Sequence, residues 1–338
     1  MVICDEGHKI KTHNTSVSKA MHKMGAVAKY RMLLTGTPVT NRAIDIFSQY
    51  KFLNPGVFGS SFYAFRSKYF FMTGYGQHTP VMKESMEEAF TCRMHRIAFR
   101  ATKAECLDLP ETTDIVRKVT LEPTAMKIYQ NLVEQSYAEL VSGEEVTAPN
   151  VLTRLLRLSQ LTGGFLGNDA TEAVEAVSTA KLAMLEDIVD ASVQENQKIV
   201  VIARFVPEID AIRKMLDQKG IHFSLIMGGV KDRDGQVRQF QNDPAVQVFI
   251  GQIATAGMGL TLTAASTMVF YSLDYSMSNY EQCRARIHRA GQKFPCTYIH
   301  LIAKGTVDGK VMLALKNKVN LARTLIDDWH KGNNPFEE

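Results

Sequence analysis

Two adjacent carboxylates, Asp5 and Glu6, follow a short apolar run near the start of this 338-residue chain. The run, residues 2–4, predicts a buried strand, and open α/β sheets bind ligands at the carboxyl ends of their strands. Because adjacent side chains on a strand point to opposite sides, one carboxylate can hold Mg²⁺ while the next orients an attacking water. The pair is a weak signal on its own, and a solvated strand end is the alternative interpretation.

Residues 282–292, with the sequence QCRARIHRAGQ, form the most specific pattern in the chain. If this segment is helical, Gln282, Arg286 and Arg289 are spaced at i, i+4 and i+7 and share one face. Two guanidinium groups on one face make a permanently charged clamp for a γ-phosphate, and arginine fingers of this kind stabilise charge in phosphoryl transfer. The alternative interpretation is an ordinary basic helix face.

Glycines and hydroxyls follow two other predicted strands. Thr35 and Thr37 flank a glycine in the segment LTGTP, where hydroxyls and main-chain N–H groups can relay hydrogen bonds from a phosphate site to a neighbouring domain. In the segment 254–266, ATAGMGLTLTAAS, Gly257 and Gly259 allow close approach of backbone to a phosphate, and Thr255 can donate a hydrogen bond to it. Each segment taken alone is more simply explained as a structural turn.

In chain order the four segments, residues 5–8, 34–38, 254–266 and 282–292, resemble motifs II, III, V and VI of the Swi/Snf-type branch of helicase superfamily 2. Residues 98–110 resemble the stretch that links the two lobes in that family, and residues 198–205 resemble its motif IV. The resemblance covers nearly the whole chain, and the ending RxHRxGQ distinguishes this branch from ordinary DEAD-box helicases. Ala101 replaces a frequent arginine and Ala285 a frequent aspartate, and neither departure changes the assignment.

The resemblance implies two recA-like lobes that bind ATP and Mg²⁺ in the cleft between them. Such proteins couple ATP hydrolysis to movement along double-stranded DNA, usually without separating its strands. The implied catalytic groups are Asp5 for the Mg²⁺, Glu6 for the attacking water, and Arg286 and Arg289 as arginine fingers. The further residues implied at the ATP and Mg²⁺ site are Gln282, Gly257 and Gly259. The residues implied in coupling the nucleotide state to DNA are Thr35, Thr37 and Thr255.

The phosphate-binding loop of this family, GxxxxGK followed by Ser or Thr, is not found in the sequence. The one Gly-Lys pair is Gly309-Lys310, which is followed by Val311. We therefore expect the chain to be the C-terminal part of a larger ATPase, with the P-loop on an upstream segment or a second polypeptide. We expect the isolated chain to be inactive. The alternative is a nonhydrolysing DNA-binding or interaction module, and the coding sequence upstream of Met1 distinguishes the two.

The elements that must position these residues alternate between strands and helices. Strands are predicted at 199–203, 222–226, 246–250, 267–271 and 297–302, with helices between them and a last amphipathic helix at 307–329, which indicates a parallel doubly wound sheet. Residues 2–4 and 31–34 repeat a fragment of this pattern, residues 41–75 predict helices under an aromatic core, and the middle is helical. The predicted fold is therefore α/β, with recA-like parallel-sheet lobes: a truncated first lobe with a helical extension (1–108), a linker and helical segment (109–180) and a complete second lobe (181–338).

Composition fits a folded protein with a polyanionic partner. Hydrophobic residues make up 45% of the chain and the net charge is +4. Basic side chains outnumber acidic ones in residues 1–110 and 191–338 but not in 111–190, and basic ends suit DNA, although an ordinary solvated surface is the alternative. No apolar run approaches the ~20 residues of a membrane helix, and none of the five cysteines forms a CxxC pair. We expect a soluble intracellular protein, cytoplasmic if it is bacterial or viral.

Overall fold

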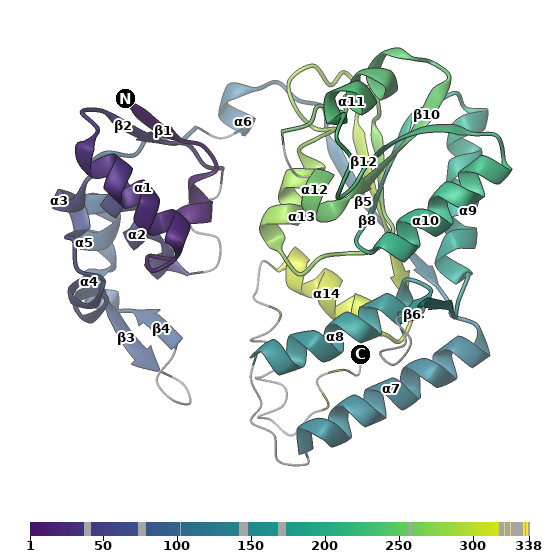
Figure 1. The fold of residues 1–338 in the computed structure, drawn as a ribbon, viewed down its shortest axis with the longest axis horizontal. Helices are drawn as coiled ribbons and strands as arrows, with labels where there is room; N and C mark the ends of the chain where they lie inside the picture. The colour runs from purple at the N-terminus through teal and green to yellow at the C-terminus, as the bar shows by residue number, and fades with distance from the viewer. Residues whose placement is uncertain are drawn as a thin grey trace. The chain divides into compact units, whose positions relative to one another are not determined.

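The computed structural model describes residues 1–36, 42–73, 79–101, 103–141, 148–167, 174–256 and 259–317, together with residues 321, 325, 334 and 336. Two compact units divide the chain, the first unit Met1–Glu105 and the second unit Cys106–Glu338 (Figure 1). This division differs from the expected one, because residues 109–180 belong to the second unit. No helix in the described ranges is both long enough and apolar enough to span a membrane.

The first unit begins with a small parallel sheet, as the sequence predicts. β1 (Val2–Cys4) pairs with β2 (Arg31–Leu33), and α1 (Ser16–Val27) connects the two strands. The side chains of this pair are only partly covered, since Ile3 is 48% exposed and Met32 is 46% exposed. Parallel strands are normally covered on both faces. The β1–β2 pair therefore presents apolar surface on which a further element can pack.

Short helices around an aromatic core make up the rest of the first unit, in agreement with the prediction for residues 41–75. The ring of Phe58 contacts those of Phe65, Tyr69 and Phe90, with centroids 5.4, 5.7 and 5.0 Å away. Aromatic pairs at these distances give specific packing in addition to buried area. The elements are the 3₁₀ helices η1 (Gly7–Ile10) and η2 (Ala43–Asp45), the helices α2 (Ile46–Leu53), α3 (Pro55–Phe58), α4 (Phe62–Tyr69), α5 (Glu84–His95) and α6 (Lys103–Cys106), and the antiparallel strands β3 (Phe70–Thr73) and β4 (Thr79–Met82).

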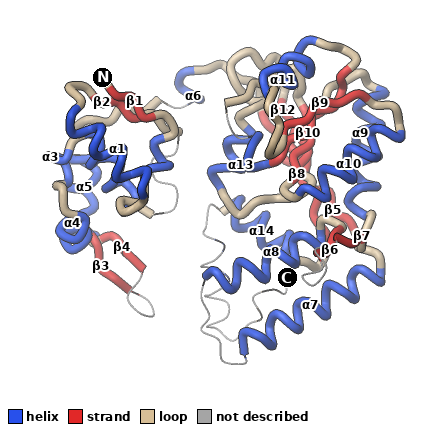
Figure 2. Tube along the Cα trace, in the orientation of Figure 1, coloured by secondary structure: helices blue, strands red, loops and turns tan. Residues whose placement is uncertain are grey.

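A six-stranded parallel sheet forms the centre of the second unit (Figure 2). Its strand order is β5-β12-β11-β8-β10-β9. The central strands arise from continuous apolar runs, and every residue of β8 is fully buried. This sheet confirms the predicted α/β architecture. The strands are β5 (Thr112–Val119), β8 (Ile199–Ala203), β9 (His222–Ile226), β10 (Val246–Gln252), β11 (Thr267–Phe270) and β12 (Cys296–Ala303).

Strand β5 is the one strand of this sheet that was not predicted from the sequence. It lies at the sheet edge and pairs with β12 over its whole length, from Thr112 beside Cys296 to Val119 beside Ala303. Most of its side chains are exposed, so its sequence, TTDIVRKV, lacks the apolar run that reveals a buried strand. Through β5, part of the predicted linker becomes part of the second unit.

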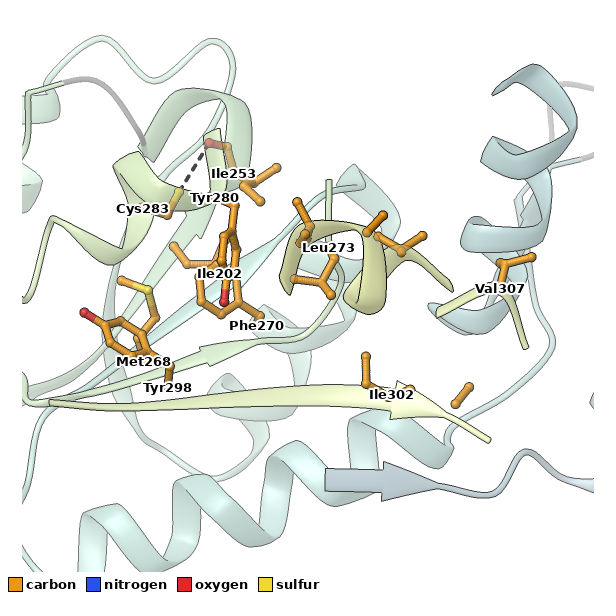
Figure 3. Close-up of a cluster of buried hydrophobic side chains, with 14 of the residues drawn as sticks. Ile202, Ile253, Met268, Phe270, Leu273, Tyr280, Cys283, Tyr298, Ile302 and Val307 are labelled. Atoms are coloured by element: carbon orange, nitrogen blue, oxygen red, sulfur yellow. Dashed lines mark hydrogen bonds between the residues drawn. The ribbon is translucent and has the colours of Figure 1, made fainter. Parts of the chain in front are cut away.

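Helices cover both faces of the sheet (Figure 1). On one face, Leu185 of α9 (Ala180–Gln194) and Ile212 of α10 (Val206–Gln218) are fully buried beside Val201 and Ile250 of the strands. On the other face, Ile202 and Phe270 pack with Tyr280 and Cys283 of α13, in the cluster drawn in Figure 3. The same cluster includes Val151, Leu155 and Leu158 of α8, which is why the middle of the chain does not form a compact unit of its own.

The remaining elements of the second unit are α7 (Pro123–Val141), α8 (Ala148–Thr162), β6 (Phe165–Gly167), β7 (Val174–Ala176), α9 (Ala180–Gln194), α10 (Val206–Gln218), α11 (Arg233–Asn242), α12 (Ile253–Ala256), α13 (Met277–Arg284) and α14 (Val307–Lys316).

A buried ion pair ties together helices that begin or end near the carboxyl edge of the sheet. Lys181 Nζ lies 2.6 Å from Asp308 Oδ2, and the two side chains are only 2% and 11% exposed. Thr162 donates a hydrogen bond to Asp308 Oδ1 at 2.8 Å, and the N–H of Ala303 donates to Oδ2 at 3.0 Å. The carboxylate is therefore paired and hydrogen-bonded, which is the condition under which a buried charge is tolerated.

Glu208 is a second carboxyl group buried in this region, at the first turn of α10. Its Oε2 accepts hydrogen bonds from Ser272 Oγ at 2.5 Å and from the N–H groups of Arg204 and Phe205, each at 3.1 Å. Its Oε1 has no hydrogen-bond partner among the described residues. Burial raises the pKa of the Glu208 carboxyl to about 7, against the opposing effect of the hydrogen bonds.

The free energy of unfolding should therefore fall as the pH rises from about 4.5 to about 7. Over this window the Glu208 carboxyl keeps its proton in the folded state and loses it in the unfolded state. A rise in pH therefore favours the unfolded state, and the free energy of unfolding falls by up to about 3 kcal/mol in total. Urea denaturation at several pH values measures this slope, and Glu208→Gln should flatten it. Glu195→Gln, at an exposed position, is the control. An unchanged slope in Glu208→Gln would contradict the assignment.

Candidate functional site

The two carboxylates lie in a turn that follows β1, which we call the Asp-Glu turn (residues 5–7). The strand ends at Cys4, so Asp5 and Glu6 do not alternate across a strand as expected. The backbone of Glu6 is left-handed instead, with φ 51° and ψ 48°, and its N–H donates to Asp5 Oδ1 at 2.8 Å. This turn, and not strand alternation, determines the directions of the carboxylates.

Hydrogen bonds hold the Asp-Glu turn beside the segment that follows β2. The N–H of Leu34 donates to Cys4 O at 2.8 Å, and the N–H of Gly7 donates to Leu34 O at 2.9 Å. The structure therefore brings Thr35, the next residue, close to the Asp-Glu turn. A Cβ at Gly7 would lie only 2.2 Å from Leu33 Cδ2, so any larger residue there would force the Leu33 side chain to move. Thr37 lies outside the described residues.

His8 is the residue that directly follows the Asp-Glu turn. Its Nδ1 is 3.2 Å from Glu6 Oε2, and burial lowers the pKa of the imidazole, which favours the neutral ring. Within the described ranges, no three His, Cys, Asp or Glu side chains converge as a metal cage would require. Asp5 is exposed and offers a hard carboxylate oxygen, which fits Mg²⁺, an ion commonly held by one or two carboxylates, waters and substrate phosphates.

In the second unit, Arg286 and Arg289 converge on one main-chain carbonyl. Arg289 Nη1 donates to Leu260 O at 2.9 Å and Arg286 Nη1 donates to the same oxygen at 3.3 Å. Arg286 Nε also donates to the carbonyl oxygen of Gln282 at 2.8 Å. These acceptors are neutral main-chain carbonyls, which orient both guanidinium groups without adding a negative charge of their own.

The two arginines do not share a helical face, which corrects the sequence interpretation. Helix α13 ends at Arg284, and residues 285–292 form an irregular segment that we call the arginine turn. The carbonyl of Arg286 accepts a hydrogen bond from the N–H of Leu262 at 2.9 Å. This contact uses the carbonyl in a bond to another loop instead of the i→i+4 bond of a continuing helix. The arginines therefore meet through tertiary contacts.

The partner of the arginine turn is residues 259–266, which we call the glycine loop. Gly259 has φ +68°, a left-handed conformation that glycine adopts without strain, and the space next to its Cα is open. Thr255 lies just upstream in α12 and is only 8% exposed, so its hydroxyl is largely covered. Helix α12 is held to α13 by Cys283 Sγ, which donates to Ile253 O at 3.5 Å (Figure 3). Gly257 lies outside the described residues.

Arg284 is a further residue near this site, and its role was not recognised from the sequence. It forms a bidentate ion pair with Asp114 of β5, and its guanidinium group lies 3.8 Å from the ring centroid of Tyr298. Arg284 Nη1 also donates to the hydroxyl of Tyr280, which is 2.9 Å from His300 Nε2. Burial lowers the pKa of His300 to about 4, so the ring is neutral. Asp114, the acidic partner in this network, lies in β5, a strand that was not predicted from the sequence.

Two family models together match most of the chain. The SNF2-related domain matches residues 1–163, and the helicase conserved C-terminal domain matches residues 180–291. An uncharacterized ATP-dependent helicase of Mycoplasma pneumoniae is 27% identical over 97% of the chain, and the DNA repair and recombination protein RDH54 of Saccharomyces cerevisiae is 25% identical over the same share. The alignments take in 31% and 38% of those two proteins, so the chain spans about a third of their length.

The chain is also similar to solved structures of SWI2/SNF2 ATPase cores. The SWI2/SNF2 ATPase core of Sulfolobus solfataricus in complex with double-stranded DNA is 26% identical, with a TM-score of 0.50, over 98% of this chain and 69% of that one. The same core domain without DNA is 25% identical, with a TM-score of 0.51, over 96% and 65%. The C-terminal part of the Fun30 ATPase domain, at 14% identity and a TM-score of 0.52 over 61% and 90%, shares the fold.

Proposed function

We propose that this chain, which belongs to the Swi/Snf-type family of helicase-like ATPases, supplies the water-activating and arginine-bearing segments of a DNA-dependent ATP hydrolase. The observation that carries the proposal is the convergence of Arg286 and Arg289 on the carbonyl oxygen of Leu260. It places two permanent positive charges within one short turn. Such charges stabilise the transferring phosphoryl group, where negative charge spreads over the equatorial oxygens.

Each unit has its own part in the proposed reaction. In the first, Asp5 would hold Mg²⁺, which would supply neutralisation of the phosphate charge, and Glu6 would orient the attacking water. In the second, Arg286 and Arg289 would contact the γ-phosphate. Within the second unit, Gly259 and Gln282 support the nucleotide, as does Gly257. The left-handed conformation of Gly259 supports its assignment, and the bond from Arg286 to the Gln282 main-chain carbonyl places residue 282 beside the proposed arginine finger.

We further propose double-stranded DNA as the partner and translocation along it as the output. The name of the Saccharomyces cerevisiae relative, a DNA repair and recombination protein, and the DNA complex of the Sulfolobus core support this proposal. Thr35, Thr37 and Thr255 are proposed to couple nucleotide state to DNA. The bonds that join Leu34 to the Asp-Glu turn support the role of Thr35, because a shift at one segment must move the other. Thr255 is largely buried, so its role requires α12 to rearrange.

The P-loop is proposed to come from an upstream segment or a second polypeptide. The half-exposed apolar side chains of the β1–β2 pair, Ile3 and Met32, support this, since neighbouring strands and helices of such a segment would cover them. We call the chain joined with that segment the complete ATPase.

The isolated 338-residue chain should show negligible ATP turnover, with or without DNA, because a missing P-loop removes the entire phosphate cradle. The complete ATPase should show turnover that is stimulated by double-stranded DNA and abolished by Glu6→Gln. A phosphate-release assay on both proteins measures this. Substantial DNA-stimulated turnover by the isolated chain, lost in Glu6→Gln, would contradict the need for a separate P-loop. DNA binding by a complete ATPase without turnover would favour a nonhydrolysing module.

A further inference from the structure

The side chain of Gln292 is a buried amide, and both its nitrogen and its oxygen make hydrogen bonds. It is 6% exposed. Its Nε2 lies within hydrogen-bond distance of three carbonyl oxygens, those of Ala265 at 2.8 Å, Ile287 at 3.1 Å and Thr263 at 3.4 Å. Its Oε1 accepts from the N–H groups of Lys293 at 2.9 Å and Phe294 at 3.0 Å. An amide is one of few side chains that can donate and accept in this way.

These bonds span the two segments that carry the proposed arginine chemistry. The carbonyls of Thr263 and Ala265 belong to the glycine loop, whereas that of Ile287 belongs to the arginine turn. The main-chain N–H of Gln292 also donates to the carbonyl oxygen of Arg289 at 3.0 Å. The side chain of Gln292 thus joins the arginine turn, through the Ile287 carbonyl next to Arg286, to the loop whose Leu260 carbonyl orients the Arg289 guanidinium.

We propose that Gln292 is the positioning residue that clamps the glycine loop to the arginine turn and holds Arg286 and Arg289 in the geometry for phosphoryl transfer. This inference rests on the proposed ATPase function. Gln292 does not itself contact the nucleotide in this proposal. It acts through the backbone of both segments, and a displacement of about 1 Å in catalytic groups can cost about 10²-fold in rate.

Gln241 provides a matched control within the same unit. Its Oε1 accepts from the N–H of Ala264 at 2.8 Å, and its Nε2 donates to Thr263 Oγ1 at 3.3 Å. It therefore holds the glycine loop from α11, on which it lies, and its bonds reach no residue of the arginine turn. A residue that merely stabilises the glycine loop should resemble Gln241, whereas a positioning residue should differ from it.

The test compares Gln292→Leu, Gln292→Glu and Gln241→Leu. In the isolated chain, hydrogen exchange at the amides of Leu262 and Ala265 should become faster in Gln292→Leu. In the complete ATPase, Gln292→Leu should lower kcat by about 100-fold with little change in the KM for ATP, and Gln241→Leu should change kcat only slightly. Gln292→Glu should regain activity relative to the unmodified protein as the pH falls, because a protonated carboxyl recovers one donor toward the carbonyls.

Several results would overturn the inference. If exchange at Leu262 and Ala265 is unchanged in Gln292→Leu, there is no clamp. If exchange increases but kcat falls no more than in Gln241→Leu, the clamp does not position the arginines. Should Gln292→Leu fail to fold, the pH series of Gln292→Glu decides, and a flat profile relative to the unmodified protein refutes the positioning role. A complete ATPase without turnover refutes the proposed function itself, a failure visible before any variant is made.

Discussion

Replacing Arg289 by alanine in the complete ATPase is expected to lower kcat by about 10³-fold or more, as for other arginine fingers. The Arg289 guanidinium is held by the Leu260 carbonyl, an acceptor that leaves its charge uncompensated for a developing phosphoryl charge. DNA affinity should remain nearly unchanged, since the proposed role lies in the transition state and not in DNA binding. Steady-state turnover at saturating DNA, together with a DNA-binding isotherm, measures both quantities.

Arg213→Ala is the matched control for this experiment. Arg213 lies on α10, is 44% exposed and pairs with Asp210 on the surface. Its removal deletes an arginine of the same unit without touching the glycine loop or the arginine turn, so kcat should be retained. A loss of DNA affinity in Arg289→Ala without loss of turnover would show that Arg289 is not an arginine finger.

Lys181→Met should lower the free energy of unfolding of the chain by about 3–5 kcal/mol, the cost of leaving a buried partner charge unpaired. The Lys181 ammonium lies 2.6 Å from Asp308, and only 2% of the Lys181 side chain is exposed. Removing it leaves the Asp308 carboxylate in the interior with hydrogen bonds from Thr162 and Ala303 but, among the described residues, no cation in contact. Urea denaturation followed by circular dichroism measures the loss.

Two further variants separate burial from charge pairing. Lys219 pairs with Glu186 and Asp190 at the surface, so Lys219→Met should leave the free energy of unfolding nearly unchanged. The double variant Lys181→Met with Asp308→Asn removes both buried charges, keeps an amide oxygen to accept hydrogen bonds and should recover much of the lost stability. A single variant as stable as the unmodified protein would show that the pair does not contribute as its geometry indicates.

The parts of the fold that the sequence predicted are those with strong apolar patterns. The prediction for β8 is confirmed to the residue because its five side chains are all buried and apolar. Strand β5 was missed because an edge strand faces solvent and carries Thr, Asp, Arg and Lys instead. The sequence pattern reports burial, so an element stabilised mainly by strand pairing leaves little trace in it.

In the candidate site, too, some features were predicted from the sequence and others were not. Residue types and spacing indicated Arg286 and Arg289, and the structure brings their side chains to one acceptor. The predicted helix beyond Arg284 was wrong, because the bond from Leu262 to the Arg286 carbonyl links positions 24 residues apart and no local pattern reports it. The proposed roles of Asp5, Glu6 and the arginines in one reaction stay predictions. Gln292 ended a recognised motif, but its clamp is visible only in three dimensions.

The contact between His288 and Pro110 has a mechanical consequence. His288 Nε2 lies 2.9 Å from the carbonyl oxygen of Pro110, and the first unit ends at Glu105. Pro110 lies two residues before β5, whose pairing with β12 begins at Thr112. A force applied along the chain from residue 105 would therefore be shared between the edge of the sheet and, through the His288 bond, the arginine turn.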